Sequence, residues 1–353
     1  MRYLVVQDWD NTHGNHAGMV HMCNLLAQNY PSEYKVLVKA CPRSLKKRGA
    51  SIWERLLSSI ESRRLVRENG RGYIDLLKPY VKSMCKGDEV FLLEYNLHMV
   101  NQYPLACYIK KIAPFVKVYA LSHLTPTWLN NDAGTIALIK KWDKVIDKHL
   151  TLGTSLTEFF CSIGIDKSRI STGFHYVDKA YYQKGELEVH RPLTIICIGA
   201  LQRDFTMLSQ IVRGCKNVNW IICKGRKNVD DLFADLGNVK LLGYLEEDEL
   251  RRNMSIADIS LNVLEDTVGS NVITTSMAMG LAIVVSDVGS IRNYCDETNA
   301  VFCENNDESF VGAINRLVNM QDEKLRMMKE ASIIRTNALG IDKVHEWFCG
   351  LKA

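Results

Sequence analysis

The sequence has little of what marks a disordered, fibrous or membrane-spanning protein. Only 7 of its 353 residues are proline, no stretch reaches 18 apolar residues, and it holds no internal repeat or low-complexity segment. A helix needs about 20 apolar residues to cross a bilayer, which excludes a transmembrane segment. The opening stretch MRYLVVQDWDN also lacks the apolar core of a signal peptide. We therefore expect a folded, cytoplasmic protein.

Paired cysteines are also missing. The eleven cysteines are scattered, with no CxxC pair and no Cys/His spacing that fits a zinc site. They indicate buried thiols in a reducing compartment. The one arrangement that suggests metal is His13, His16 and His21 in NTHGNHAGMVH, and no second ligand cluster supports it. We expect no metal and no bound cofactor.

Excess charge is confined to one region of the chain. The formal net charge is +4, but residues 43–82 hold eleven Lys/Arg against four acids, a local charge of +7. Within this region, IWERLLSSIESRRLVR predicts a helix with one apolar stripe and several arginines. Such a helix suits peripheral contact with a membrane through residues 43–83. The alternative is a core-packed helix with a solvated basic face. No recognised module predicts nucleic-acid binding.

Short apolar runs alternate with helical patterns along the whole chain. Examples are YLVVQ (3–7), EVFLLE (89–94), LTIICIGA (193–200) and AIVVSD (282–287). This alternation predicts parallel sheets covered by helices on both faces. Because one core rarely extends beyond about 250–300 residues, we expect two doubly wound α/β domains. Their predicted bounds are 1–180 and 190–335, with a C-terminal helix at 336–353 packing back on the first domain.

The stretch GSNVITTSMAMGLAIVVSDVG (269–289) places small polar residues at the start of a predicted helix. A helix N-terminus offers unpaired backbone N–H groups and about half a positive charge, which suits a phosphate. Ser270 and Asn271 would add side-chain donors. The alternative is that Ser270 is an ordinary N-cap.

Several motifs give the chain a resemblance to a known family. They are IGALQRDF, WIICKG, LLGYLEEDELRRNMSIADISLNVL and SNVITTSMAMGLAIVVSDVGSIRNY. In this order and spacing, residues 193–318 resemble the donor-binding domain of GT-B glycosyltransferases, in the large retaining group called family 4. The N-terminal half is compatible, through HAGMVHMCNLLAQNYP and LTLGTSLTEFFCSIGIDKSRI. The resemblance implies two Rossmann-like domains facing each other across a cleft.

The resemblance also implies a donor site for a UDP- or GDP-linked sugar. It places the diphosphate at the start of the 269–289 segment, on Gly269, Ser270, Asn271 and Val272. The family usually carries two glutamates nearby, and the matching positions here are Thr267 and Thr275. A hydroxyl at Thr275 would bond a ribose less strongly than a carboxylate. Glu265 or Asp266 are the possible replacements for the missing acids.

Further donor contacts are expected at three strand ends. Arg203 follows Gly199, where the family places basic residues against the diphosphate, and a guanidinium fork matches phosphate oxygens. Lys224 and Arg226 flank the glycine of a second strand end, and Tyr244 falls where the family lines the nucleobase pocket. The alternatives are solvated surface charges and a packing tyrosine.

In the N-terminal half the resemblance points to the acceptor side. It places Gly18 near the donor phosphates or the acceptor, and Asp10 and His16 are candidate acceptor contacts. His123 ends the strand KVYALSH, where the family commonly has a histidine beside the anomeric centre. We expect His123 to orient the sugar or acceptor, and we name His123 and Arg203 as the catalytic candidates.

The expected function is that of a retaining, metal-independent glycosyltransferase of the hexosyltransferase type. It would move a sugar from its nucleotide carrier to a glycan or lipid-linked acceptor in glycan or polysaccharide biosynthesis. Two alternatives stay open. One is a GT-B sugar-nucleotide epimerase, which needs no acceptor. The other is a non-catalytic GT-B subunit that binds a nucleotide or glycan, which the absent glutamates would favour.

Overall fold

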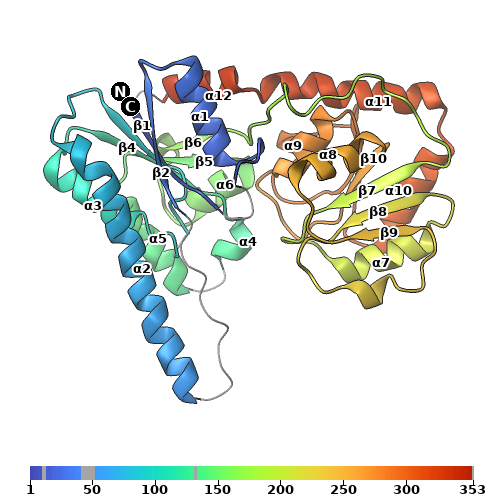
Figure 1. Ribbon diagram of the computed structural model, residues 1–353, viewed down its shortest axis with the longest axis horizontal. Helices are drawn as coiled ribbons and strands as arrows, with labels where there is room; N and C mark the ends of the chain where they lie inside the picture. The colour runs from blue at the N-terminus through green and yellow to red at the C-terminus, as the bar shows by residue number, and fades with distance from the viewer. Residues whose placement is uncertain (10–12, 41–51, 98, 131–132, 352–353) are drawn as a thin grey trace. The chain divides into compact units, whose positions relative to one another are not determined.

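The computed structural model describes residues 1–9, 13–40, 52–97, 99–130 and 133–351 (Figure 1). The chain forms two compact units. Unit 1 comprises residues 1–152, 156–173 and 347–353, and unit 2 comprises residues 153–155 and 174–346. The change from one unit to the other at 173–174 falls before the predicted bounds, because Val177 already donates its N–H to Leu339 O within unit 2.

Unit 1 is built on a six-stranded parallel sheet. The strands at residues 2–7, 89–92 and 117–121 are mostly buried and apolar, as parallel strands covered on both faces must be. The strand order is β2 (Tyr34–Lys39), β1 (Arg2–Gln7), β3 (Glu89–Leu92), β4 (Lys117–Leu121), β5 (Lys148–Thr151) and β6 (Ile170–Thr172). The helices between them are α1 (Met19–Asn29), α2 (Ile52–Val81), α3 (Tyr103–Ile112), α4 (Pro126–Leu129), α5 (Ala133–Asp143) and α6 (Thr154–Ser162).

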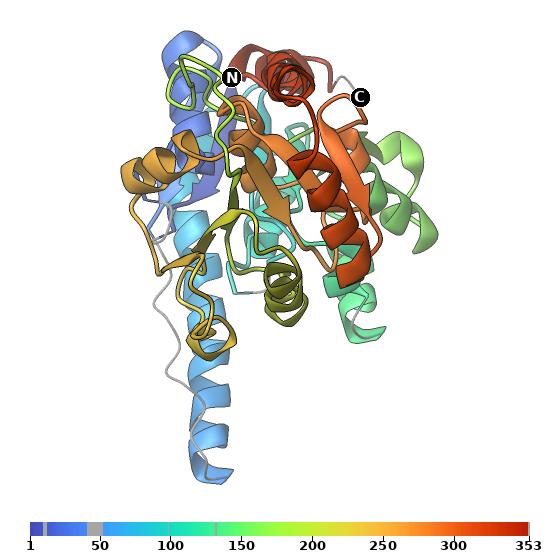
Figure 2. The ribbon, with the colours of Figure 1, turned by 90° about the vertical axis from the view of Figure 1, so that its right-hand side faces the viewer.

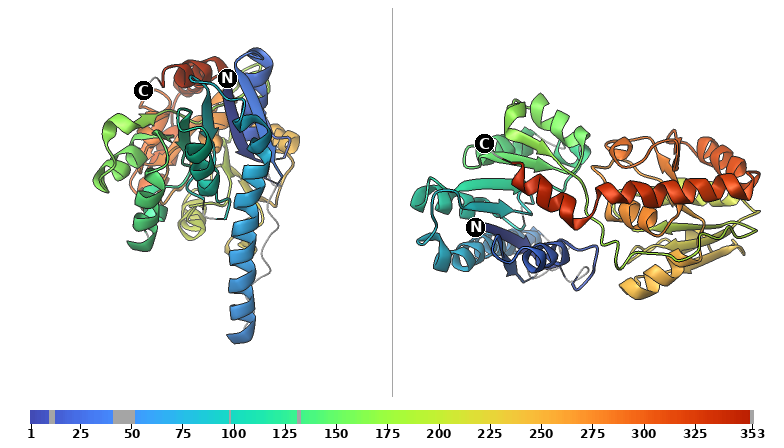
Figure 3. Two further views of the ribbon diagram at one scale, coloured as in Figure 1. Left: turned by 90° about the vertical axis from the view of Figure 1, so that its left-hand side faces the viewer. Right: turned by 90° about the horizontal axis from the view of Figure 1, so that it is seen from above.

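Helix α2 extends well beyond the end of this sheet (Figures 1 and 3). Its C-terminal half is anchored in the core by the buried side chains of Tyr73, Leu77 and Val81. Of the predicted apolar stripe, the side chains at 52–57 lie outside the described part, and Ile60 is 55% exposed. Ile60 is therefore not packed in a core, and the membrane contact stays a prediction. In the described residues no helix combines the length and hydropathy required to cross a bilayer.

Unit 2 holds a second six-stranded parallel sheet. Its order is β12 (Ala300–Cys303), β11 (Ala282–Ser286), β10 (Ile259–Asn262), β7 (Thr194–Ile198), β8 (Asn219–Cys223) and β9 (Val239–Leu242). Its helices are α7 (Phe205–Gly214), α8 (Glu247–Ser255), α9 (Asn271–Ala278), α10 (Asp307–Val318) and α11 (Asp322–Arg335). The last helix of the chain, α12 (Ile341–Cys349), follows.

Helices α7 and α10 cover one face of the second sheet (Figure 2). They pack Phe205, Leu208, Phe310 and Ile314 against alternate strand residues such as Ile195 and Trp220. On the opposite face, Ser276 of α9 bonds to Ser260 of β10 across 2.9 Å. The predicted class of two doubly wound α/β domains is confirmed.

Both sheets contain a point where the strand order reverses. In unit 1 the chain goes from β1 outward to β2 and then returns to β3 on the other side of β1. In unit 2 it goes from β7 outward to β9 and returns to β10 beside β7. Ligands of open α/β sheets bind at the carboxyl ends of the strands at such a switch point. The β1/β3 and β7/β10 edges are therefore where a site is expected.

Candidate functional site

The loop after β7 brings a glycine and an arginine to the switch point of unit 2. Gly199 has a φ of +92°, a conformation that side chains rarely adopt, and lets the chain turn at the strand end. Gln202 also has a positive φ, of +50°. The turn directs Arg203 back over the strand end, where its backbone forms a bridge with Leu264 after β10.

The guanidinium of Arg203 is buried, and no carboxylate among the described residues forms an ion pair with it. Its Nε donates to Ile198 O at 2.7 Å and its Nη2 to Asn262 Oδ1 at 3.2 Å, while its Nη1 is buried with no partner. Burial lowers the pKa of Arg203 to about 10, so the side chain is still a cation at neutral pH. Nη1 is therefore a buried donor whose hydrogen-bonding capacity is unused among the described residues.

The start of helix α9 lies next to this arginine. A Cβ placed on Gly199 would be 3.5 Å from Arg203 Nε and 3.8 Å from Val272 Cγ2, so the strand end, the guanidinium and the first turn of α9 meet. Ser270 is the N-cap, and its hydroxyl accepts the N–H of Val272 at 3.1 Å. The ordinary capping role is thus present. The positive end of the α9 macrodipole and the charge of Arg203 both attract an anion to this position.

Two contacts hold the α9 start in place. The Nδ1 of His175 lies 3.0 Å from Asn271 Oδ1, and the N–H of His175 donates to the Tyr294 hydroxyl at 2.9 Å. Gly269, with a φ of +102°, lies so close to the Tyr294 ring that a Cβ would be 2.3 Å away. The sequence did not identify His175, because a lone histidine far along the chain from residue 271 carries no local signal.

The hydroxyl of Thr275 turns back toward its own helix. It donates to Asn271 O at 2.7 Å. In a bond to a ribose the Thr275 oxygen would therefore be the acceptor, and that bond stays a prediction. Thr267 Oγ1 accepts the N–H of Gly269 at 3.0 Å. Of the possible replacement acids, Glu265 is exposed, whereas Asp266 is buried and its Oδ1 accepts the N–H of Thr267 at 2.7 Å. These side chains shape the loop before α9.

The two strand ends beyond β7 carry the remaining predicted donor residues. Lys224 pairs with Asp230 at 2.5 Å and also donates to Lys227 O, and this pairing lowers the pKa of the Asp230 carboxyl. The guanidinium of Arg226 lies over the ring of Tyr244, 5.1 Å from its centroid. Tyr244 is 41% exposed, so it is not a core tyrosine.

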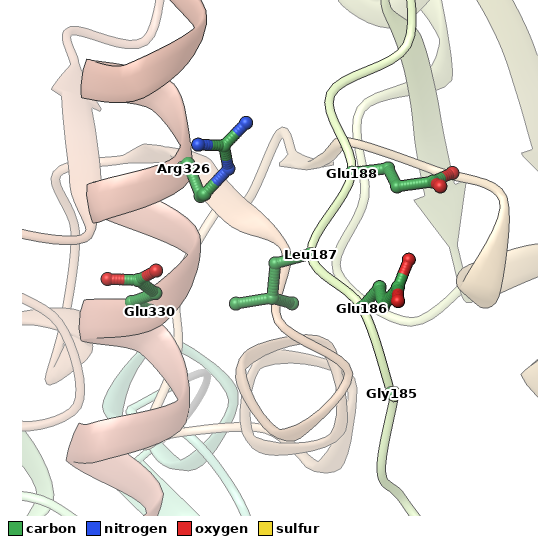
Figure 4. A pocket seen from close by; sticks show the side chains of 6 residues that line it. All are labelled: Gly185, Glu186, Leu187, Glu188, Arg326 and Glu330. Atoms are coloured by element: carbon green, nitrogen blue, oxygen red, sulfur yellow. The ribbon is translucent and has the colours of Figure 1, made fainter.

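A cavity of about 420 Å³ lies elsewhere in unit 2 (Figure 4). Leu187 points toward helix α11, whereas Glu186 and Glu188 point away from it. Leu187 also contacts the position of Gly280, just before the amino end of β11. The cavity therefore lies at the amino edge of the sheet, opposite the switch point. Its lining consists of Gly185, Glu186, Leu187, Glu188, Arg326 and Glu330.

In unit 1, His123 lies at the carboxyl edge of the sheet, as its position after β4 predicts. Its Nε2 is 2.7 Å from Leu93 O and 3.9 Å from Glu94 Oε2. Glu94 is only 4% exposed; burial raises the pKa of its carboxyl, and His123 and the Trp9 N–H oppose that rise. Sequence analysis missed Glu94, although an acid directly after a buried apolar strand was the available signal.

Two other predicted residues of unit 1, Gly18 and His16, lie at or near the start of helix α1. Gly18 is buried and is the N-cap of α1, with no side chain capping the helix. The rings of His16 and His21 lie 4.5 Å apart. Asp10 lies outside the described residues. The acceptor roles of Asp10 and His16, and the expectation that no metal is needed, stay predictions.

Comparison with protein families gives one match. Residues 192–320 match the family model described as Glycosyl transferases group 1. The matched residues include the loop after β7 and the start of α9. A comparison with curated proteins finds no match to this sequence.

Solved structures of similar fold cover nearly the whole chain. Anabaena HepE in complex with UDP and glucose is 12% identical, with a TM-score of 0.70 over 99% of this chain and 98% of that chain. A glycosyltransferase from Rickettsia africae is 12% identical, with a TM-score of 0.67 over 99% and 98%. The N-terminal domain of Candida albicans trehalose-6-phosphate phosphatase is 9% identical, with a TM-score of 0.73 over 99% and 96%. At these identities the likeness is one of fold, and the predicted GT-B fold is confirmed.

Proposed function

Starting from the match of residues 192–320 to the group 1 glycosyl transferases, we propose that this protein transfers a sugar from a nucleoside-diphosphate sugar to a hydroxyl acceptor. The donor would bind at the β7/β10 switch point of unit 2. UDP is the first nucleotide to test, because Anabaena HepE was solved with UDP and glucose, and GDP is the second.

One observation carries this proposal, the buried cation of Arg203. Within the part of the chain that the structure describes, its guanidinium donates to two neutral acceptors, Ile198 O and Asn262 Oδ1, and its Nη1 has no partner. Burying a charge is costly unless an opposite charge pairs with it. A diphosphate between Arg203 and the first turn of α9 would supply that charge and accept the unused N–H. This is support for an anion site that is built before its ligand binds.

The proposed chemistry follows from the same two groups. As the bond from the sugar to the diphosphate breaks, negative charge builds on the departing phosphate oxygen. A preorganised cation and a helix N-terminus stabilise that charge without rearranging. The proposal includes retention of the anomeric configuration, transfer of a hexose without a metal, and an acceptor in glycan or polysaccharide biosynthesis. For these finer points the support is the family resemblance.

A second candidate function is nucleotide binding without transfer. The observation in its favour is that Thr267 and Thr275 stand where the family usually has glutamates, and both hydroxyls bond to nearby backbone. An epimerase is a third candidate, which would consume the donor with no acceptor present. Measuring donor consumption with and without an acceptor separates all three.

The test uses thermal unfolding of the full chain with UDP, GDP and ADP. Wild type is compared with Arg203→Met and Arg203→Lys, and Arg213→Met is the matched control because Arg213 pairs with Asp235 on the exposed surface. We expect one nucleotide to raise the Tm of wild type and of Arg213→Met. Arg203→Met should lose the effect, and Arg203→Lys should keep part of it, since an ammonium keeps the charge but not the fork.

The outcome that contradicts the donor site is an equal nucleotide shift in wild type and Arg203→Met, or no shift with any nucleotide. Where a nucleotide binds, its UDP- or GDP-sugar is then incubated with the protein and mixed glycans. Release of nucleotide that requires the glycan supports transfer. Release without an acceptor, or none at all, favours the two alternatives.

A further inference from the structure

A buried histidine lies on β5, a strand of unit 1 that takes no part in the β1/β3 switch point. The side chain of His149 is only 1% exposed. Strand β5 pairs with the edge strand β6, where His149 is opposite Ile170. The His149 ring also contacts the ring of Phe160 in α6, with 4.9 Å between the ring centroids. The imidazole is therefore part of the contact between this edge of the sheet and α6.

His149 belongs to a chain of hydrogen bonds that anchors the start of β6. Its Nε2 lies 2.9 Å from Asp143 Oδ1 at the end of α5, and because a carboxylate can only accept, Nε2 carries a proton. Arg169 donates its Nη1 to the other carboxylate oxygen of Asp143 at 2.9 Å. The Arg169 Nη2 donates to the backbone carbonyls of Asp143 and Ile146 at 3.0 and 2.8 Å. Since Arg169 directly precedes β6, the Asp143 carboxylate connects His149 to the edge strand.

The charges of these three side chains balance only while His149 is neutral. Burial raises the pKa of the Asp143 carboxyl, but the hydrogen bonds and charges of His149 and Arg169 outweigh that effect and leave the pKa below its ordinary value. Asp143 is therefore a carboxylate at neutral pH, and it pairs with the Arg169 cation. Burial lowers the pKa of His149, the Asp143 carboxylate opposes that change, and the Arg169 charge adds to it. The folded protein thus favours the neutral imidazole.

The second ring nitrogen of His149 gives a geometric reason for the same preference. His149 Nδ1 is buried and has no hydrogen-bond partner among the described residues. Because Nε2 already carries a proton, a further proton would bind at Nδ1. It would create a charged N–H donor in the core with no acceptor paired with it, which is costly for a buried group. The folded structure around His149 therefore disfavours the imidazolium, and opening to water relieves the cost.

We propose that His149, Asp143 and Arg169 form an acid-sensitive contact that holds β6 and α6 to the rest of unit 1. As the pH falls, His149 takes up a proton at Nδ1 and this edge opens, while Asp143 and Arg169 stay charged. The opening is local, because β6 has three residues and a single neighbouring strand. The open state binds a proton that the folded state excludes. Opening therefore increases as the pH falls through the ordinary histidine pKa of about 6.5, and it levels off below the folded-state pKa.

The experiment measures hydrogen exchange of the full chain by mass spectrometry between pH 5 and pH 8, with each rate corrected for the intrinsic pH dependence of amide exchange. Peptides that cover 148–172 report on the edge, and a peptide that covers β11 reports on the core of unit 2. The test variant is His149→Gln, whose Nε2 can still donate to Asp143 but whose amide takes up no proton. The control is His13→Gln, because the His13 side chain is 76% exposed. NMR of 13C-labelled histidine in wild type measures the protonation of the His149 ring directly.

In wild type and His13→Gln, we expect the opening of 148–172 to increase by up to about tenfold between pH 7.5 and pH 5.5, while β11 stays protected. His149→Gln should remove this increase. The proposal is overturned if the opening of 148–172 in wild type is independent of pH, or if His149→Gln shows the same dependence. Should His149→Gln fail to fold, the NMR measurement decides. A His149 ring that stays neutral while 148–172 is closed supports the proposal, and a ring that becomes protonated while this segment stays closed contradicts it.

Discussion

Arg203 Nη2 donates to Asn262 Oδ1 across 3.2 Å, which ties the loop after β7 to the end of β10. The bond lies at the point where the strand order of unit 2 reverses. It gives the buried guanidinium a neutral acceptor where a structural ion pair would use a carboxylate. Because the amide of Asn262 does not neutralise it, the Arg203 cation can still pair with an anionic ligand.

Replacing that neutral acceptor with a charged one should raise the stability of the free protein and lower its affinity for the nucleotide. In Asn262→Asp, the new carboxylate would pair with Arg203 in the absence of any anion. We expect the Tm of the free protein to rise by a few degrees and nucleotide affinity to fall about tenfold, which corresponds to 1.4 kcal/mol. Thermal unfolding with and without UDP measures both.

The matched control for this change is Asn315→Asp on the exposed part of helix α10. It adds the same charge to unit 2 far from any buried cation and should change neither quantity measurably. A fall in nucleotide affinity equal to that of Asn262→Asp would show that net charge, and not the pairing of Arg203, is responsible.

The buried carboxyl of Glu94 should make the stability of the protein depend on pH. Burial raises its pKa in the folded state, so the unfolded chain ionises at this position first, near its ordinary pKa of about 4.3. As the pH rises through that value, the unfolded chain loses its proton first, so the free energy of unfolding falls. The loss becomes constant above the folded-state pKa of Glu94. Glu94→Gln removes it, and its amide oxygen can still accept the Trp9 N–H.

We therefore expect Glu94→Gln to match wild type in denaturant unfolding at pH 4 and to be more stable than wild type at pH 8. The same comparison for exposed Glu68→Gln should show no such trend. A Glu94→Gln variant that loses stability relative to wild type as the pH rises would mean that the ionised carboxylate is stabilised by its surroundings.

Gly289 is predicted to be irreplaceable for a steric reason. Its φ is +56°, and a Cβ would lie 2.1 Å from Thr267 O and 2.6 Å from Asp266 Oδ1, in the loop that precedes α9. Gly289→Ala should cost about 2 kcal/mol or more of unfolding free energy and displace that loop. Gly312→Ala, in the interior of α10 with open space around it, should instead stabilise by about 0.5–1 kcal/mol. Denaturant unfolding of the two variants decides whether the steric account is correct.

The C-terminal segment 347–351 should be needed for the stability of unit 1. The Phe348 ring lies 4.4 Å from that of Phe91 on β3, and both side chains are fully buried, while Tyr119 of β4 donates to Leu351 O at 3.3 Å. Phe348→Ala should destabilise the protein by about 3–5 kcal/mol. Trp128→Ala removes a larger ring that is 57% exposed and should cost no more than about 0.5 kcal/mol. Equal losses in the two variants would contradict the assignment of the tail to the core.

The class of fold could be predicted from the sequence, because strands buried on both faces of a parallel sheet appear as continuous apolar runs. The runs at 3–7, 89–94, 193–200 and 282–287 correspond to β1, β3, β7 and β11. Strand β6 (Ile170–Thr172) was missed. Two of its three residues are partly buried and the third, Thr172, is exposed, so they form no apolar run that could be distinguished from a loop.

Part of the candidate site could also be predicted from the sequence, since Gly199 and the segment 269–271 carry local signals for a turn and for a helix start. The direction of the side chains could not. The Thr275 hydroxyl donates to Asn271 O, a partner that the sequence did not identify, and its bond to a ribose stays a prediction. Lys224 pairs with Asp230, which the sequence did not identify either, and its contact with a diphosphate stays a prediction. Such local partners compete with a ligand, and which one a side chain reaches depends on backbone geometry.

What the sequence by itself determined was which residues form strands and which follow them at their ends. The order of the strands was decided only by the tertiary structure, because hydrogen bonds between strands join segments that are distant along the chain. That order sets β7 beside β10 and β1 beside β3. It brings Arg203 to Asn262 over a separation of 59 positions, and Trp9 to Glu94 over one of 85. Neither pair has a local signal, since each contact exists only once the sheet has formed.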